Sequence, residues 1–246
     1  MKKYFYSTML ICLMLVVWEV VARIVAVSFI LPSPIQIIEK LFVLKGPLLK
    51  EHLPVTLTVI GIGLTISLLL GIAVAMMMHG SKLIEQAIYP LLITSQTIPI
   101  IALAPIFVLW FGYTIWSKVV VTILITFFPI AIGTFDGLRS TDKDFKELFQ
   151  TFGLTNHQIF LKLEVPSALP SFFSGLKVAV PMSVIGAAIG EWLGAQSGLG
   201  YFSRRMMTQF DGAGVFAPIV LLSLIGIALF MIVLIIEKFF LKWRNI

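Results

Sequence analysis

The sequence predicts an all-α, polytopic membrane protein with about six transmembrane helices, because it is strongly apolar, carries few charges and contains long uncharged runs. Of its 246 residues, 59% are hydrophobic and 12% are charged, against about 45–50% and about 25% in soluble domains. A helix needs about 20 apolar residues to cross the hydrocarbon core of a membrane. Runs of this length lie at residues 4–28, 53–78, 86–111, 117–136, 174–195 and 213–236.

The first run follows a short basic start, residues 1–3, and continues to Ile30 without a small-residue cleavage site. We therefore expect a retained helix rather than a signal peptide. Glu19 and Arg23 lie four residues apart within it and can neutralise one another on one helix face. The single cysteine, Cys12, also lies inside this run, which excludes an intrachain disulfide.

The uncharged stretch at residues 86–117, which contains the third run, is too long and too rich in proline for one straight helix, which predicts a broken or bent helix. A break frees backbone carbonyls that must face protein or a water-filled path. Gln96, Thr97 and Pro99 are therefore candidates for lining a pathway. The alternative is a kink that only shapes packing.

The fifth run contributes two further pathway candidates, Ser183 and Glu191. An ionisable residue in a membrane span is costly and needs a partner or a purpose. Glu191 is expected near the outer mouth, where it could bind a substrate amine or a proton, or pair with Arg204 or Arg205. Three glycines recur every fourth residue along this run and predict a close packing face, either within one subunit or between two copies. They are Gly186, Gly190 and Gly194.

The basic residues are distributed unevenly between the two sides that six crossings would define. Eleven Lys and Arg residues belong to the termini and the loops on their side, against six in the opposite loops. Basic loops favour the cytoplasm, so we expect both termini there. The basic residues are dispersed among apolar runs, which favours surrounding lipid and argues against a nucleic-acid partner.

The longest hydrophilic interruption, residues 137–166, lies on the predicted cytoplasmic side and reads as two short helices. Thr141 or Asp142 can cap the first one, and Gly153 ends it. Thr155 and Gln158 form a capping box for the second, which Pro166 is expected to end. The first helix has an apolar face, which an amphipathic hairpin lying on the membrane surface would also have. That face comprises Phe145, Leu148, Phe149 and Phe152.

The spacing in this hairpin resembles the signature loop of binding-protein-dependent ABC importer permeases. That loop has a Glu-Ala-Ala triplet, then a glycine, then an apolar residue and Leu-Pro. Leu148 and Phe149 replace the two alanines here, and Val165 replaces the leucine before proline. The resemblance implies a type I ABC importer permease fold in which the hairpin contacts a cytoplasmic ATPase, so that Gly153→Asp should uncouple transport from ATP hydrolysis. The implied coupling residues are Glu147, Leu148, Phe149, Gly153, Leu163 and Pro166.

Three other stretches resemble the permease branch that serves sulfonates, taurine, nitrate and pyrimidine precursors of thiamine. They are residues 103–112, 190–195 and 198–201, and the resemblance covers about residues 50–240. It implies a first helix and outer segment at residues 1–50 and a permease domain at 51–240. The implied cargo is a thiamine-precursor pyrimidine such as hydroxymethylpyrimidine or formylaminopyrimidine, or a sulfonate, taurine or nitrate. The implied partners are a cytoplasmic ABC ATPase, an extracytoplasmic solute-binding protein and a second copy of the permease.

The sequence offers no sign of an enzyme, a bound cofactor or a metal site. It contains no phosphate-binding loop of the Walker type and no zinc-protease motif, so ATP is expected to be used by the partner subunit. His79 and His157 are isolated at helix ends, where solvated or capping roles are expected. The competing function is an ion-gradient-driven secondary carrier, which would predict inverted repeats and carboxylates at mid-membrane.

Overall fold

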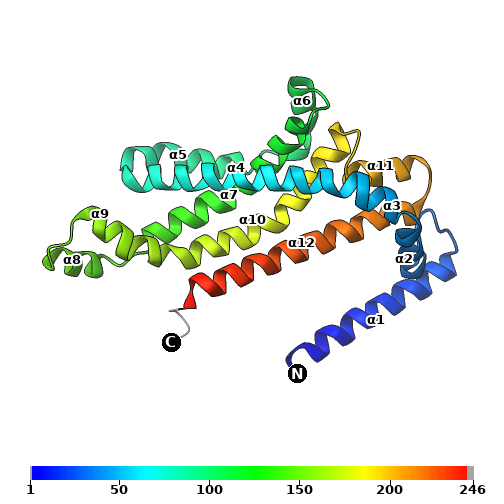
Figure 1. The fold of residues 1–246 in the computed structure, drawn as a ribbon, viewed down its shortest axis with the longest axis horizontal. Helices are drawn as coiled ribbons and strands as arrows, with labels where there is room; N and C mark the ends of the chain where they lie inside the picture. The colour runs from blue at the N-terminus through cyan, green and yellow to red at the C-terminus, as the bar shows by residue number, and fades with distance from the viewer. Residues whose placement is uncertain (1, 243–246) are drawn as a thin grey trace.

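The computed structural model describes residues 2–242, which form helices joined by short turns, with no β-strand among them (Figure 1). Five helices in this range are long and apolar enough to cross a membrane, and two shorter ones, bent by 99° against each other, can form a sixth crossing. The prediction of an all-α protein with about six crossings is confirmed. The long helices are α1 (Lys2–Val25), α4 (Leu53–Gly80), α7 (Ile115–Arg139), α10 (Val165–Gly194) and α12 (Gly212–Phe240), and the bent pair is α5 (Lys82–Ser95) with α6 (Ile100–Phe111).

Short helices gather at the two ends of the bundle (Figure 1). The hairpin end, on the left of Figure 1, carries α8 (Lys143–Thr151) and α9 (Asn156–Ile159). The loop end, on the right, carries α2 (Pro34–Val43), α3 (Lys45–Pro47) and α11 (Leu199–Thr208). Arg244, one of the basic residues counted above, lies outside the described residues.

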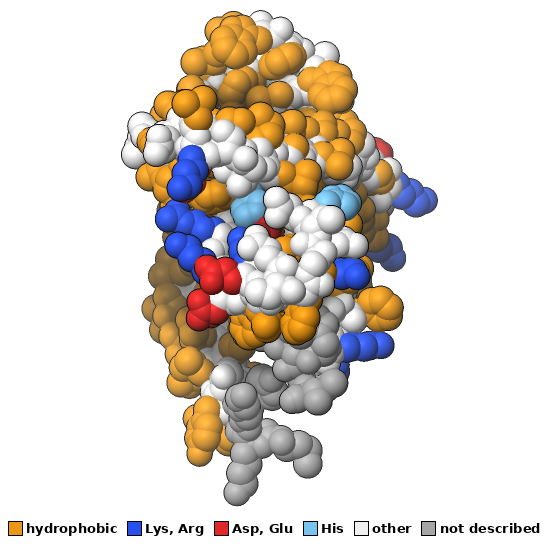
Figure 2. Space-filling view, turned by 90° about the vertical axis from the view of Figure 1, so that its left-hand side faces the viewer, with side chains coloured by type: hydrophobic (Ala, Val, Ile, Leu, Met, Phe, Trp, Pro, Cys, Tyr) orange, Lys and Arg blue, Asp and Glu red, His pale blue; other side chains and the backbone are white. Residues whose placement is uncertain are grey.

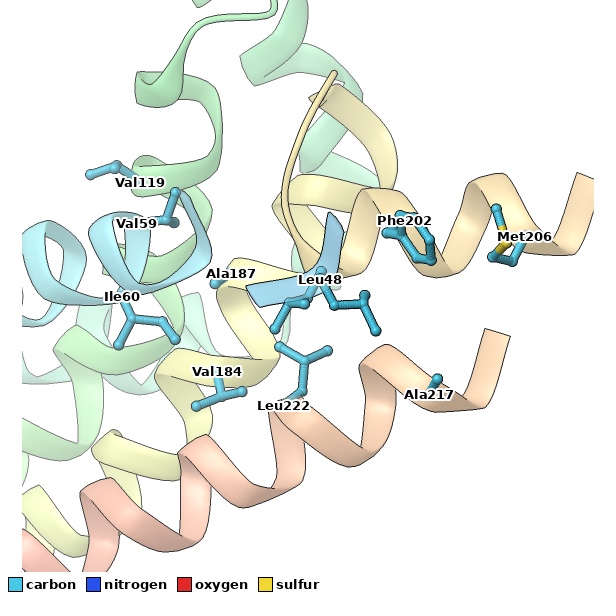
Figure 3. Packing of buried hydrophobic residues seen from close by; sticks show 11 residues of the cluster. Leu48, Val59, Ile60, Val119, Val184, Ala187, Phe202, Met206, Ala217 and Leu222 are labelled. Atoms are coloured by element: carbon cyan, nitrogen blue, oxygen red, sulfur yellow. The ribbon is translucent and has the colours of Figure 1, made fainter. Parts of the chain in front are cut away.

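A buried apolar cluster near the loop end joins four of the long elements (Figure 3). It brings together side chains from α4, α7, α10 and α12 with those of α11 and of the π-helical turn η1 (Leu48–His52). Between membrane-spanning helices, close van der Waals packing of such side chains stabilises the contact, because lipid tails are as apolar as the side chains themselves. The helices at the loop end therefore pack against one another and are not merely joined by flexible loops. The cluster comprises Leu48, Val59, Ile60, Val119, Val184, Ala187, Leu199, Phe202, Met206, Ala217 and Leu222.

The most extensive contact between two helices is that of α7 and α10, and glycines allow the two backbones to approach closely. A Cβ on Gly190 would lie 2.8 Å from the Cα of Lys118 in α7, and one on Gly186 would lie 2.9 Å from the Cα of Thr122. Of the two roles considered for the glycine face, the structure therefore supports packing within one subunit. Toward the hairpin end, a Cβ on Gly175 would collide with the backbone carbonyl of Pro129.

We expect Gly175→Ala to destabilise the fold, because the added methyl group meets backbone, which cannot rotate away. Overpacking of this kind costs about 1–3 kcal/mol. The matched control is Gly61→Ala in α4, where a Cβ has no neighbour within 4 Å. Thermal unfolding of the detergent-solubilised protein should show a lower midpoint for Gly175→Ala only, and equal midpoints would contradict the crossing described here.

The break predicted in the third run is present. α5 ends at Ser95 and α6 begins at Ile100, so the break falls at residues 96–99. Pro90 and Pro105 lie inside the two helices and do not interrupt them. Pro99 directly precedes α6 with extended backbone, a conformation in which proline starts a helix without losing a hydrogen bond.

The expectation that Pro166 ends the second hairpin helix is wrong. The chain remains helical from Asn156 to Gly194, through a π-helical turn, η2 (Phe160–Glu164), directly into α10. Pro166 lies in the first turn of α10, and the wide π turn before it accommodates the proline ring and its missing N–H. The helix that contains the fifth apolar run therefore begins well before residue 174.

Candidate functional site

The hairpin end presents the apolar face predicted for α8. Asp142 caps the helix by accepting the backbone N–H of Asp144 at 2.9 Å. Phe145, Leu148 and Phe152 are exposed by 55%, 45% and 71%, while Phe149 is half-buried. An exposed row of large apolar side chains on a short helix is typical of a surface that binds a partner.

Local backbone signals fix the shape of the hairpin as predicted. Gly153 ends α8 with a φ of +77°, a conformation that favours glycine. The capping box of α9 is complete: the Gln158 backbone N–H donates to Thr155 Oγ1 at 3.4 Å, and the Thr155 N–H donates to Gln158 Oε1 at 2.9 Å. The turn between α8 and α9 is therefore short and well defined.

The remaining predicted coupling residues lie on the two arms of the hairpin. Glu147 is exposed on α8, and Leu163 and Pro166 are half-buried in the helical run that leads into the membrane. Figure 2 views the hairpin end and shows basic and acidic side chains gathered around the hairpin, bordered by hydrophobic ones.

The role expected for His79, a solvated or capping histidine, is wrong. Its Nε2 atom lies 2.7 Å from Oε2 of Glu164, and Glu164 itself is buried. The second carboxylate oxygen, Oε1, accepts the ammonium group of Lys146 in α8 at 2.5 Å. A three-residue cluster thus joins α4, α8 and η2.

The candidate pathway residues fall into two groups. Gln96, Thr97 and Pro99 are exposed at the bend between α5 and α6, where Thr97 Oγ1 donates to the carbonyl of Thr94 at 2.7 Å. Ser183 is buried in α10 and donates to the carbonyl of Val180 at 2.6 Å. The structure does not bring Ser183 to the bend.

A hollow of about 900 Å³ begins near the bend, at Ile101, and continues along α10 and α12. Its lining is almost entirely apolar and includes Trp192, Ser203 and Phe230. The side chains of Ser183 and Glu191 do not line it, because α10 turns them toward the other helices. Their assignment to a pathway stays a prediction.

Glu191 is buried at the loop end of α10 in a polar network that the sequence only partly indicated. Its carboxylate accepts the Thr56 hydroxyl at 2.8 Å and the Gly200 backbone N–H at 2.8 Å. Lys118 in α7, also buried, supplies an opposite charge nearby. The alternative pairing of Glu191 with Arg204 or Arg205 is therefore wrong.

Sequence reasoning missed His52, the last residue of η1, and Thr56 in the first turn of α4. His52 Nδ1 accepts the Gly198 backbone N–H at 3.1 Å, and Thr56 Oγ1 accepts the Leu199 N–H at 2.9 Å. Each pair spans more than 140 residues of chain. The network connects the first turn of α11 to α4 and α10. No local sequence pattern predicts contacts between residues so far apart in the chain.

The predicted pair on α1 is present. Arg23 Nε lies 2.7 Å from Glu19 Oε1, and Glu19 Oε2 also accepts the Ile35 backbone N–H at 3.2 Å. The pair therefore connects α1 to the start of α2. Within residues 2–242 no group of three or more His, Cys, Asp or Glu side chains is placed to hold a metal ion.

Comparison with known proteins gives consistent matches. Residues 67–242 match the family described as the inner membrane component of binding-protein-dependent transport systems. The chain is 57% identical to the formylaminopyrimidine transport permease of Halalkalibacterium halodurans over 97% of its length and 95% of the relative's. It is 32% identical to the riboflavin transport system permease of Chloroflexus aurantiacus, over 94% of the chain and 87% of the relative. It is 31% identical to a putative aliphatic sulfonates transport permease of Bacillus subtilis, over 93% of the chain and 84% of the relative.

Proposed function

The chain belongs to the family of inner membrane components of binding-protein-dependent transport systems. From this membership we propose the solute that it carries and the surface on which its ATPase binds. It is the membrane-spanning permease subunit of an ATP-driven ABC importer and a multi-pass protein of the cytoplasmic membrane. Such a subunit moves its cargo by alternating access. We infer that it performs no covalent chemistry and binds no cofactor, and that ATP is used by its partner.

The proposed cargo is a thiamine-precursor pyrimidine such as formylaminopyrimidine. The 57% identity to a permease named for formylaminopyrimidine, over nearly all of both chains, supports this cargo. The riboflavin permease, at 32% identity, also carries the name of a flat nitrogen heterocycle, whereas the sulfonate permease is named for an anion. An almost wholly apolar hollow suits a neutral, planar ring better than a sulfonate or nitrate.

Cells that depend on the precursor for growth provide a direct uptake test. Uptake of labelled formylaminopyrimidine should require this chain and should be competed by hydroxymethylpyrimidine or unlabelled precursor. An excess of taurine, an alkanesulfonate or nitrate should leave uptake unchanged. Competition by sulfonates alone would overturn the proposed cargo while leaving the transporter class intact.

The proposed ATPase contact is the hairpin at residues 137–166, and the observation that carries it is the exposed apolar face of α8. A rigid element of two short helices can transmit a rigid-body motion into the membrane. With the hairpin on the cytoplasmic side of the membrane, both termini also lie in the cytoplasm, and a solute-binding protein docks at the opposite, loop end. Residues 1–50 precede a permease domain at residues 51–240. A transport pathway of this kind lies between two membrane halves, and we assign the second half to another copy of this chain.

The ATPase contact can be tested by co-purification from native membranes through a C-terminal tag. Phe145→Glu with Phe152→Glu should lose the ATPase, because charge on the apolar face cannot be buried without a partner. Gln150→Glu, on the opposite face of the same helix, is the matched control and should retain it. If the double variant retains the ATPase as well as the control does, α8 is not its docking surface.

A further inference from the structure

We propose that Glu164 is the positioning residue that carries the movement of α8 into the membrane helices. The inference rests on the proposed ATPase contact at α8 and adds the connection between α8 and the membrane helices. Glu164 is the last residue of η2 and leads directly into α10. Neither the signature spacing nor the apolar face of α8 points to this position.

The geometry joins three elements at one carboxylate. Oε1 of Glu164 accepts Lys146 Nζ from α8 at 2.5 Å, and Oε2 accepts His79 Nε2 from the last turn of α4 at 2.7 Å. Each oxygen serves a different helix. A displacement of α8 is therefore transmitted both to the end of α4 and to the start of α10.

This link matters because α8 has few other attachments. Among residues 2–242, the Lys146–Glu164 ion pair is the one polar side-chain contact between α8 and another helix. Three of the four side chains of the apolar face of α8 are exposed, and only Phe149 is half-buried. Besides the ion pair, α8 is held by its chain connections, residues 140–142 to α7 and the Gly153 turn to α9, so the pair is its side-chain link to α4 and to the start of α10.

Burial makes the link stiff. The Glu164 side chain is 11% exposed and those of Lys146 and His79 are 29% and 21% exposed, so water and salt screen the pair less than a surface ion pair. The His79 ring also lies against the Phe160 ring, with centroids 6.1 Å apart, which fixes the end of α4 to the first residue of η2. The cluster is therefore held on both the polar and the apolar side.

The experiment uses the complete importer in proteoliposomes, with formylaminopyrimidine as cargo, and measures solute taken up per ATP hydrolysed. Lys146→Met leaves the His79–Glu164 contact in place, and Glu164→Gln removes the charge at the centre of the cluster. Both variants should retain the bound ATPase and ATP hydrolysis, with uptake per ATP lowered about tenfold or more. Lys143→Met, an exposed residue of the same helix, is the control and should match the wild type.

Exchanging the two charges distinguishes a loss of coupling between α8 and the membrane helices from a general loss of folding. Lys146→Glu combined with Glu164→Lys restores an ion pair between positions 146 and 164, and uptake per ATP should rise well above that of either single variant. Wild-type coupling in Lys146→Met, or no recovery in the exchange, would overturn the proposal. Loss of the ATPase from Lys146→Met would place this residue in the docking contact and also overturn it. Failure of the wild-type chain to retain any ATPase would instead refute the proposed function.

Discussion

Gly198→Ala is expected to give a chain that no longer accumulates as a folded membrane protein. Gly198 has a φ of +116° and a ψ of 160°, a region of backbone space that is essentially restricted to glycine. A Cβ there would also collide with the carboxylate of buried Glu191. Glu191 cannot rotate away without giving up the Thr56 hydroxyl and the Gly200 N–H, and an unpaired buried carboxylate is costly.

The matched control for this prediction is Gly112→Ala. Gly112 has a φ of +65° and a ψ of −163°, so it carries a similar backbone strain, but a Cβ there has no neighbour within 4 Å. Size-exclusion chromatography of fluorescent fusions should show a moderate loss of monodisperse protein for Gly112→Ala and a nearly complete loss for Gly198→Ala. Equal yields would mean that the Glu191 network does not constrain the turn.

Gly153→Val is expected to uncouple transport from ATP hydrolysis. The turn after α8 requires a φ of +77°, at which a β-branched residue is a genuine outlier. A Cβ has open space around it, so the effect comes from the backbone alone, and α8 is expected to lose its angle to α9. Uptake of formylaminopyrimidine should fall about tenfold or more while the chain still folds.

Substitutions that tolerate positive φ provide the control for Gly153→Val. Asn adopts this conformation more readily than other residues, so Gly153→Asn should retain most of the uptake. Asp is similar, and the uncoupling expected for Gly153→Asp should therefore be milder than that for Gly153→Val. If all three variants transport like the wild type, the shape of this turn does not matter for coupling.

Local features of the fold could be predicted because their causes lie within a few residues of each other. The bend at residues 96–99, the capping box of Thr155 with Gln158 and the end of α8 at Gly153 are all present. The error at Pro166 has a local cause as well. A proline normally ends a helix, but the π turn at Phe160–Glu164 allows the run to continue.

The polar networks could not be predicted, because their partners are far apart in the chain. Thr56 and Glu191 are separated by 135 residues, and His79 and Glu164 by 85. The sequence marks Glu191 as unusual for a membrane span, but it does not say which face of α10 the carboxylate occupies. Helix packing decides this, and it turns Glu191 toward α4 and α7 instead of the hollow beside α12.

Site-specific cross-linking can show whether the apolar face of α8 contacts the ATPase. Replacing Cys12, the chain's single cysteine, with serine allows a photoreactive thiol reagent to be attached at Phe152→Cys in α8 or at Met207→Cys in α11. Both native side chains are exposed, by 71% and 51%. We predict an adduct between this chain and the ATPase from position 152 and none from position 207. An ATPase that co-purifies but cross-links only from position 207, or from neither position, would contradict the claim.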